Sequence, residues 1–127
     1  MITLPIFILS VSYLIFVLVG QVLYKKAAVT VSTESVSSFI SSLAVNPPLW
    51  IATLFYILAM IVWVLLLKQL PLSRVFPAMS AVLLLSLPIV SYYFLGEPLT
   101  LRYWLGVALI LAGIALIATE IPEKVVV

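Results

Sequence analysis

The chain has no cysteine and no histidine, and its 127 residues include only six lysines or arginines and four aspartates or glutamates. These absences exclude disulfides, thiol chemistry and the usual zinc sites. No nucleophile–base pair, metal cluster or phosphate-binding loop is recognisable, so we expect neither an enzyme nor a bound cofactor. The net charge of +2 is small and scattered, which argues against nucleic acid as a partner.

Every charged side chain lies outside four long apolar runs, at residues 2–24, 49–67, 75–95 and 103–119. Crossing the hydrocarbon of a bilayer takes about 20 helical residues at about 1.5 Å each, and the runs have roughly that length. Backbone groups in lipid must pair within their own segment, so we expect helices. The prediction is an all-α integral membrane protein, one domain over residues 1–127 with four transmembrane helices. We expect the first run to be kept as a span and not cleaved as a signal peptide.

Basic residues do not indicate an orientation, because three lie on each side of the predicted bundle. Lys68, Arg74 and Lys124 share a side with the termini, and Lys25, Lys26 and Arg102 lie opposite. The positive-inside rule therefore gives a tie. Dual insertion as an antiparallel homodimer, an orientation fixed by a partner, and one orientation set by other features all stay open.

The connection over residues 25–48 is the only long one. Val36, Phe39, Ile40 and Leu43 recur at helical spacing with serines between them, which predicts a short amphipathic helix in the membrane interface. A disordered serine-rich loop is the alternative. The connections at 68–74 and 96–102 are short, so the second and third spans are expected to be antiparallel neighbours, and Gly96 suits a helix C-cap.

Polar residues form a stripe along the first span, at Ser10, Tyr13, Gly20, Gln21 and Tyr24. The Gln21 amide is costly to bury without a hydrogen bond, so it must face another helix or a wet cavity. It would either contact substrate or form an interhelical hydrogen bond. Lys25 continues this face after the span, and would either snorkel to the headgroups or contact a phosphate or carboxylate.

The third span contains two prolines. Pro77 is expected in its first turn, where proline is tolerated, whereas Pro88 falls mid-span and frees the carbonyl of Leu84. Pro88 would serve as a hinge for alternating access or reflect helix packing. Glu97, just beyond this span, is expected to cap a helix or to pair with Lys25 or Arg102.

No ionisable residue lies inside a predicted span, so proton-coupled antiport through a membrane carboxylate is not expected. In the fourth span, Gly106 and Gly113 are two turns apart on one face. Small residues there allow close approach of another helix, either from a second subunit or within the chain.

Several motifs together resemble the drug/metabolite transporter superfamily in its EamA-like branch: Leu67-Lys68-Gln69-Leu70-Pro71-Leu72-Ser73, Phe76-Pro77-Ala78-Met79-Ser80, Leu95-Gly96-Glu97-Pro98-Leu99-Thr100, Trp104-Leu105-Gly106 and Gly113-Ile114. With four spans, Gly20-Gln21 and Lys25, the chain most resembles small subunits proposed to flip aminoarabinose-phosphoundecaprenol. This resemblance implies a bacterial-type inner-membrane carrier that moves a polyprenyl-phosphate-linked sugar as a dimer.

The chain is also similar to the small multidrug resistance proteins, which suggests a comparable half-transporter bundle. Gly106, Leu109, Ile110, Gly113 and Ile114 match their last-span pattern, which implies a dimer interface there. Their essential first-span glutamate would fall near Val17, their third-span tryptophan near Met79, and the tyrosine before it near Phe76. These departures argue against proton-coupled export of cationic drugs, since valine cannot exchange a proton.

The predicted function is a flippase or transporter subunit for an amphiphilic substrate such as a polyprenyl-phosphate-linked sugar, acting as a homodimer or with a second four-span subunit. A small-metabolite or multidrug exporter and a non-transporting accessory or scaffold subunit are the alternatives. The hinge is Pro88, the dimer interface is Gly106, Leu109, Ile110 and Gly113, and no metal site is expected. Seven residues are predicted to bind substrate: Tyr13, Gln21, Tyr24, Lys25, Ser80, Glu97 and Arg102.

Overall fold

The computed structural model describes residues 4–120 and contains only helices in that range. They are α1 (Leu4–Thr30), α2 (Val36–Ala44), α3 (Pro47–Gln69), α4 (Leu72–Leu95) and α5 (Leu101–Glu120). Within these residues, α1, α3, α4 and α5 are long and apolar enough to cross a membrane. The all-helical, four-span prediction is therefore confirmed. The start of the first predicted span, at residues 2 and 3, and Lys124 lie outside the described residues.

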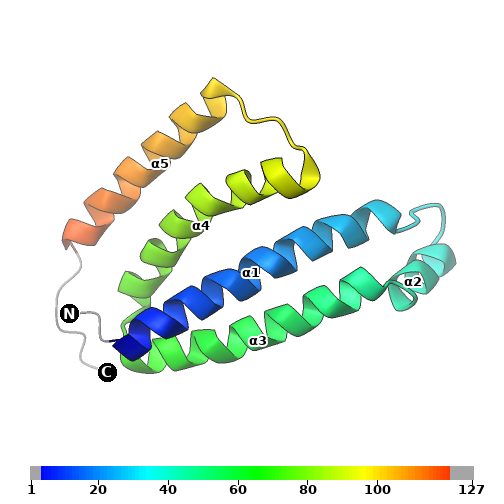
Figure 1. The fold of residues 1–127 in the computed structure, drawn as a ribbon, viewed down its shortest axis with the longest axis horizontal. Coiled ribbons are helices and arrows are strands. Elements are labelled where there is room, and N and C mark those ends of the chain that lie inside the picture. Colours follow the sequence, from blue (N-terminus) through cyan, green and yellow to red (C-terminus); the bar gives the residue numbers. More distant parts are fainter. Residues whose placement is uncertain (1–3, 121–127) are drawn as a thin grey trace.

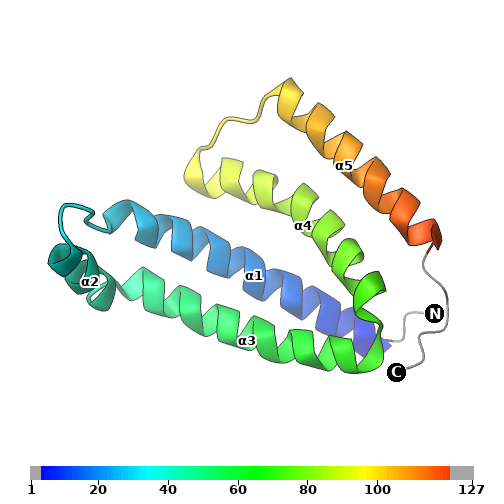
Figure 2. The same cartoon turned by 180° about the vertical axis from the view of Figure 1, so that it is seen from behind.

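α1 and α3 form a close pair, and α4 and then α5 fan out from it (Figure 1). α1 and α3 run side by side over their length, α4 packs mainly on α1, and α5 contacts mainly α4. The view from behind gives the same order of helices (Figure 2). The tight turn keeps α3 and α4 adjacent at that end only, and they touch little elsewhere. The prediction that they are antiparallel neighbours thus holds at the turn but fails along the helices, because side-chain packing brings α4 onto α1.

Small residues and aromatic rings build the contact between α1 and α3. Three ring pairs cross it, with centroids 5.0 Å apart for Tyr13 and Trp63, 6.0 Å for Phe16 and Phe55, and 5.0 Å for Tyr24 and Tyr56. Gly20 lies under the Tyr56 ring, and a Cβ placed on this glycine would come within 2.6 Å of two ring carbons. The absence of a side chain at Gly20 therefore sets how closely the two helices approach.

The predicted amphipathic helix exists as α2. Ser35 caps it, with its hydroxyl accepting a hydrogen bond from the Ser38 backbone N–H while the Ser38 hydroxyl accepts one from the Ser35 backbone N–H. Such a reciprocal cap fixes the start of a helix too short to be stable alone. The alternative of a disordered serine-rich loop is wrong for these residues.

Asn46 joins the end of α1 to the start of α3. Its side chain is 4% exposed, and its amide donates to the Ala27 carbonyl and the Thr30 hydroxyl at 3.2 and 3.1 Å. Its oxygen accepts from the Leu49 backbone at 3.3 Å, which caps α3. The sequence analysis did not predict this link between two spans.

Two helices extend beyond the apolar runs from which they were predicted. α1 continues to Thr30, so Lys25 and Lys26 lie inside the helix and not after it, because lysine propagates a helix well. α4 begins at Leu72, before its apolar run, which places Pro77 beyond the first turn. The expectation that Pro77 sits in the first turn is therefore wrong.

α4 is curved (Figure 1), as expected of a helix with two internal prolines. Gly96 adopts a left-handed φ of 67° as the C-cap of α4, as predicted.

The outer face of α5 has no partner within the described residues. Among the described residues of α5, only Val107 is buried. Leu109, in contrast, is 76% exposed. No residue between 4 and 120 outside the helix itself comes within 4 Å of a Cβ placed on Gly106 or Gly113. Packing within this chain therefore does not account for the small residues of this helix.

Candidate functional site

Three hollows follow the seam between α1 and α4 from one end of the bundle to the other. We call them the rim, middle and aromatic hollows, and together the track. The rim hollow, of about 260 Å³, is lined by Gln21, Val22, Lys25, Leu87, Val90, Ser91, Leu95 and Glu97. The middle hollow, of about 290 Å³, is lined by Val17, Gln21, Ser80, Leu83, Leu84, Leu87, Pro88 and Tyr103. The aromatic hollow, of about 570 Å³, is lined by Tyr13, Trp63, Leu72, Ser73, Phe76 and Pro77.

One face of α1 supplies a wall to all three hollows. Tyr13, Val17, Gln21 and Lys25 are spaced by four residues, which places them in line along a helix. At about 1.5 Å per residue, the distance from the first to the last of them is about 18 Å along the axis. The hydrocarbon core of a bilayer is about 30 Å thick, so the track covers more than half of it.

The rim holds the charges of the track. The Lys25 Nζ lies 3.2 Å from the Glu97 Oε1, and their side chains are 55% and 45% exposed. The buried Ser91 donates a hydrogen bond from its hydroxyl to the other carboxylate oxygen of Glu97. Of the two ion pairs expected for Glu97, the structure forms the one with Lys25.

The surroundings of Glu97 favour its charged form. The hydrogen bond from Ser91, followed by the contact with Lys25, holds the pKa of Glu97 below its usual 4.5. A carboxyl group whose pKa is lowered by folding stabilises the folded state above its usual pKa, and this contribution is lost as the pH falls through the lowered value. Near neutral pH the rim therefore carries both a cation and an anion.

Gln21 borders both the rim and the middle hollow. Its side chain is exposed, and no hydrogen bond to another described residue is formed by its amide. Of the two interpretations of this residue, the cavity wall fits the structure and the interhelical hydrogen bond does not. The amide is therefore free to donate to and accept from a ligand in the track.

The middle hollow lies beside the interruption in α4. Pro88 is buried there, and it cannot donate a hydrogen bond to the carbonyl of Leu84, which lines the same hollow. Ser80 and Tyr103 complete the polar part of the wall. The seam thus offers hydroxyl and amide groups at mid-depth between otherwise apolar side chains.

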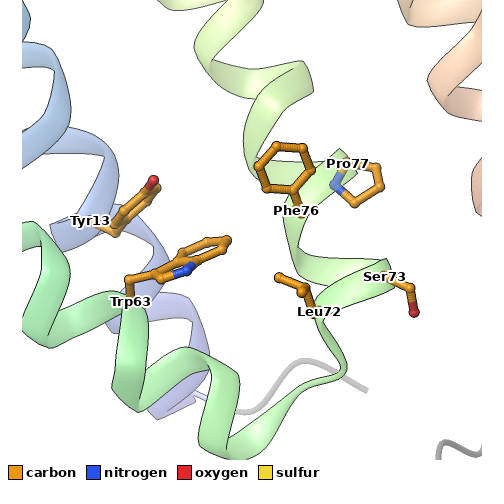
Figure 3. A pocket seen from close by; sticks show the side chains of 6 residues that line it. All are labelled: Tyr13, Trp63, Leu72, Ser73, Phe76 and Pro77. Carbon is orange, nitrogen blue, oxygen red and sulfur yellow. The ribbon is translucent and has the colours of Figure 1, made fainter.

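The aromatic hollow closes the opposite end of the track. The rings of Tyr13 and Trp63 stack with an interplanar angle of 32°, and Figure 3 shows them facing Phe76 across the hollow. The three rings come from α1, α3 and α4. Nothing in the sequence identified Trp63, because the rotational setting of α3 decides which of its residues meets Tyr13.

Five of the seven predicted substrate-binding residues line the track: Tyr13, Gln21, Lys25, Ser80 and Glu97. Tyr24 instead packs on α3, with its hydroxyl 3.3 Å from that of Thr53. Arg102 is exposed in the first turn of α5 and lines none of the three hollows. Ser91 lines the rim hollow but was not among the residues predicted to bind substrate.

The track has no arrangement for metal or redox chemistry. Among the described residues, no group of three acidic, histidine or cysteine side chains could hold a metal ion. What it offers is a charged rim, an amide and hydroxyls at mid-depth, and aromatic rings at the far end. This arrangement suits non-covalent contact with a molecule that has a polar head and an apolar body.

Fold and track together define the class: a small, multi-pass helical membrane protein with a partly polar seam. The chain is similar to proteins named "Probable 4-amino-4-deoxy-L-arabinose-phosphoundecaprenol flippase subunit ArnE". The Yersinia pestis (strain Pestoides F) protein is 46% identical over 61 residues, which are 48% of this chain and 53% of the relative. The Pseudomonas fluorescens (strain Pf0-1) protein is 29% identical over 75 residues, or 59% and 65%.

The match spans about half the length of the first of these curated relatives. No family model matches the chain, and no solved structure matches it. The resemblance to aminoarabinose-phosphoundecaprenol flippase subunits is confirmed as a sequence similarity, and these relatives are named as flippase subunits, not as enzymes. With its four spans, the chain is a multi-pass protein of a bacterial-type inner membrane.

Proposed function

We propose that the chain is one subunit of a flippase, which moves an amphiphilic, lipid-linked sugar phosphate across the inner membrane as a dimer. The observation that carries this proposal is the track: three hollows in order along α1 and α4, polar at the rim and at mid-depth. A headgroup could pass along this seam while its polyprenyl chain stays in the surrounding lipid. Contact with amides and hydroxyls replaces part of the water that the headgroup loses.

The relatives support the class of cargo. Their name specifies a sugar carried on phosphoundecaprenol, a molecule with an apolar chain, a phosphate and a polar sugar. The track offers a cation at Lys25 for the phosphate and an amide at Gln21 for sugar hydroxyls. The track provides no charged group at mid-depth, so movement of the cargo's headgroup past this point depends on hydrogen bonds.

A dimer is proposed from the free face of α5. Gly106, Leu109, Ile110 and Gly113 share this face, and no other described part of the chain covers it. The relatives are named as subunits, which agrees with assembly from more than one chain. The partner is a second copy or another four-span protein, and the α5 face serves in both cases.

The aromatic hollow supports a second candidate, export of a small metabolite or drug. Rings of Tyr13, Trp63 and Phe76 suit a flat or cationic molecule. The two candidates differ in the cargo that moves, so an assay with both kinds of probe separates them. The exposed amide of Gln21 disfavours a scaffold without a transport path, because such a protein would bury and pair this amide in a packed interior.

Inner-membrane vesicles from the producing cell test the proposal, because they keep any partner subunit in place. Transbilayer movement of a fluorescent polyprenyl-phosphate-linked sugar would be followed by quenching with a membrane-impermeant reagent. We expect movement that requires the gene, and that falls by about tenfold in Gln21→Leu, equivalent to about 1.4 kcal/mol in the activation barrier. Val64→Leu, on an exposed position of α3, is the matched control and should leave the rate unchanged.

Equal rates in vesicles with and without the gene would contradict the flippase. Gene-dependent efflux of a small aromatic cation with no lipid movement would support the exporter instead. Because the chain has no cysteine, a single Gln21→Cys substitution provides a unique thiol. Reaction of this thiol with a water-soluble reagent is expected, and complete protection would support the scaffold.

A further inference from the structure

We propose that Lys25 and Glu97 form an exchangeable ion pair that recognises a headgroup carrying both an amine and a phosphate. The phosphate of the cargo replaces Glu97 on Lys25, while the amine replaces Lys25 on Glu97. The inference rests on the proposed function and adds what the rim selects. The pair thus decides which lipid-linked sugars enter the track.

The two charged groups come from different segments. Lys25 extends from α1, and Glu97 follows the C-cap of α4 in the connection to α5. Their nitrogen and oxygen are 3.2 Å apart at the mouth of the rim hollow, and about half of each side chain is exposed. An ion pair this exposed contributes little net free energy and is open to competition by other ions.

The pair is asymmetric in how its members are held. Ser91 is buried and donates a hydrogen bond to the Glu97 carboxylate, which stays in place when Lys25 leaves. Among the described residues, Glu97 is the only ion-pair partner of Lys25, whose charge lies at the end of a flexible four-carbon stem. Lys25 is therefore the moving member, and Glu97 marks a fixed anionic point.

Charge balance gives the selectivity. A lipid that brings only a phosphate must displace Glu97 from Lys25 and leave that carboxylate unpaired beside a like charge. A headgroup with an amine as well compensates both members at once. Such a difference between cargo molecules is discrimination by an unfavourable contact with the wrong one.

The remaining wall of the rim hollow suits the apolar part of such a cargo, next to its phosphate. Below the ion pair it is lined mainly by apolar side chains, namely Val22, Leu87, Val90 and Leu95. The isoprene units next to the phosphate fit this surface, while the rest of the polyprenyl chain stays in the surrounding lipid. The name of the relatives describes a cargo with an amino group and a phosphate. The hollow thus provides a cationic, an anionic and an apolar contact within one small volume.

The test uses two fluorescent polyprenyl-phosphate probes that differ only in their sugar, one bearing an amine and the other a hydroxyl at that position. Binding to the purified protein in lipid nanodiscs is measured beside movement in the vesicles. The wild type should bind the amine probe about tenfold tighter. Glu97→Gln should bring the two affinities within about twofold of each other, chiefly by weakening the amine probe. Lys25→Gln should weaken both probes.

Glu120→Gln, an exposed carboxylate at the end of α5, is the matched control and should keep the wild-type preference. Ser91→Ala should reduce the preference partly, because Glu97 is no longer held. The inference is overturned if the wild type binds both probes equally, or if Glu97→Gln keeps the preference. Preferential binding without any movement in vesicles would support the ion-pair recognition and contradict the flippase.

Discussion

Gly20 shows how one residue controls the packing of two spans. The Tyr56 ring occupies the place that a side chain on Gly20 would take, and a Cβ there would meet it at 2.6 Å. Gly20→Ala should therefore push this ring away and weaken the α1–α3 contact, at a cost of about 1–3 kcal/mol for an overpacked core. Thermal unfolding in detergent, followed by circular dichroism, measures the loss.

The matched background for this test is Tyr56→Leu, which removes the ring that Gly20→Ala would displace. In that background the same alanine should cost much less. An equal loss in both backgrounds would mean that the strain arises elsewhere, and the double-mutant cycle gives the coupling directly.

The sequence could assign a residue to the track where the cost of burying its polar group in lipid decides which way it faces. Gln21 and Glu97 could be assigned because an amide or a carboxylate near lipid needs a polar surrounding. Tyr24 lines none of the three hollows, because a tyrosine has an apolar body that packs equally well on α3. Trp63 and Asn46 were missed, since their contacts depend on how two helices are rotated about their axes, which periodicity within one segment does not contain.

At the scale of elements, α4 is the helix whose shape departs most from an ideal rod. Pro88 removes a hydrogen bond at mid-span, and the adjacent middle hollow lies on the track. Pro88→Ala would restore a backbone hydrogen bond to Leu84 and straighten the helix. We expect unchanged or higher thermal stability and movement of the lipid probe slowed by about tenfold, about 1.4 kcal/mol in the barrier.

Pro77→Ala is the comparison, because this proline also interrupts α4 but lies near its turn to α3. It should slow movement less than Pro88→Ala. Equal rates for Pro88→Ala and the wild type would reject the hinge. Equal slowing by both substitutions would instead indicate that the general curvature of α4 matters, and not a hinge at Pro88.

The existence of the helices was more predictable than their ends. Four apolar runs predicted four spans, and the spacing of apolar residues in the first connection favoured α2 over a disordered loop. Hydropathy marks where lipid begins, but a helix continues until a cap or a proline stops it. α1 therefore extends past Lys25 to Thr30, and α4 starts before its apolar run.

The molecule as a whole is unevenly packed. α1 and α3 hold each other along their length, whereas α5 touches mainly α4 and exposes the face with Gly106 and Gly113. If this face binds another subunit, Gly113→Leu should raise the dimer dissociation constant by about tenfold or more, about 1.4 kcal/mol. Single-molecule photobleaching in lipid vesicles over a range of protein densities measures this constant.

Thermal stability at high dilution should be unaffected by Gly113→Leu, because no described residue lies near this position within the chain. Val64→Leu on α3 is the control and should leave association unchanged. An unaltered dimer in Gly113→Leu would place the subunit contact elsewhere, and a loss of stability in the isolated chain would mean that α5 packs inside it.

The Asn46 link has a consequence for how the chain is made. All its partners, in residues 27–49, have been synthesised before α4 leaves the ribosome, so the first helical hairpin can close as soon as it enters the bilayer. The last helix of the second hairpin contacts mainly α4 and meets little of the first hairpin. Translation thus completes the clasped hairpin first, and the hairpin that follows carries the exposed α5 face to which we propose that another subunit binds.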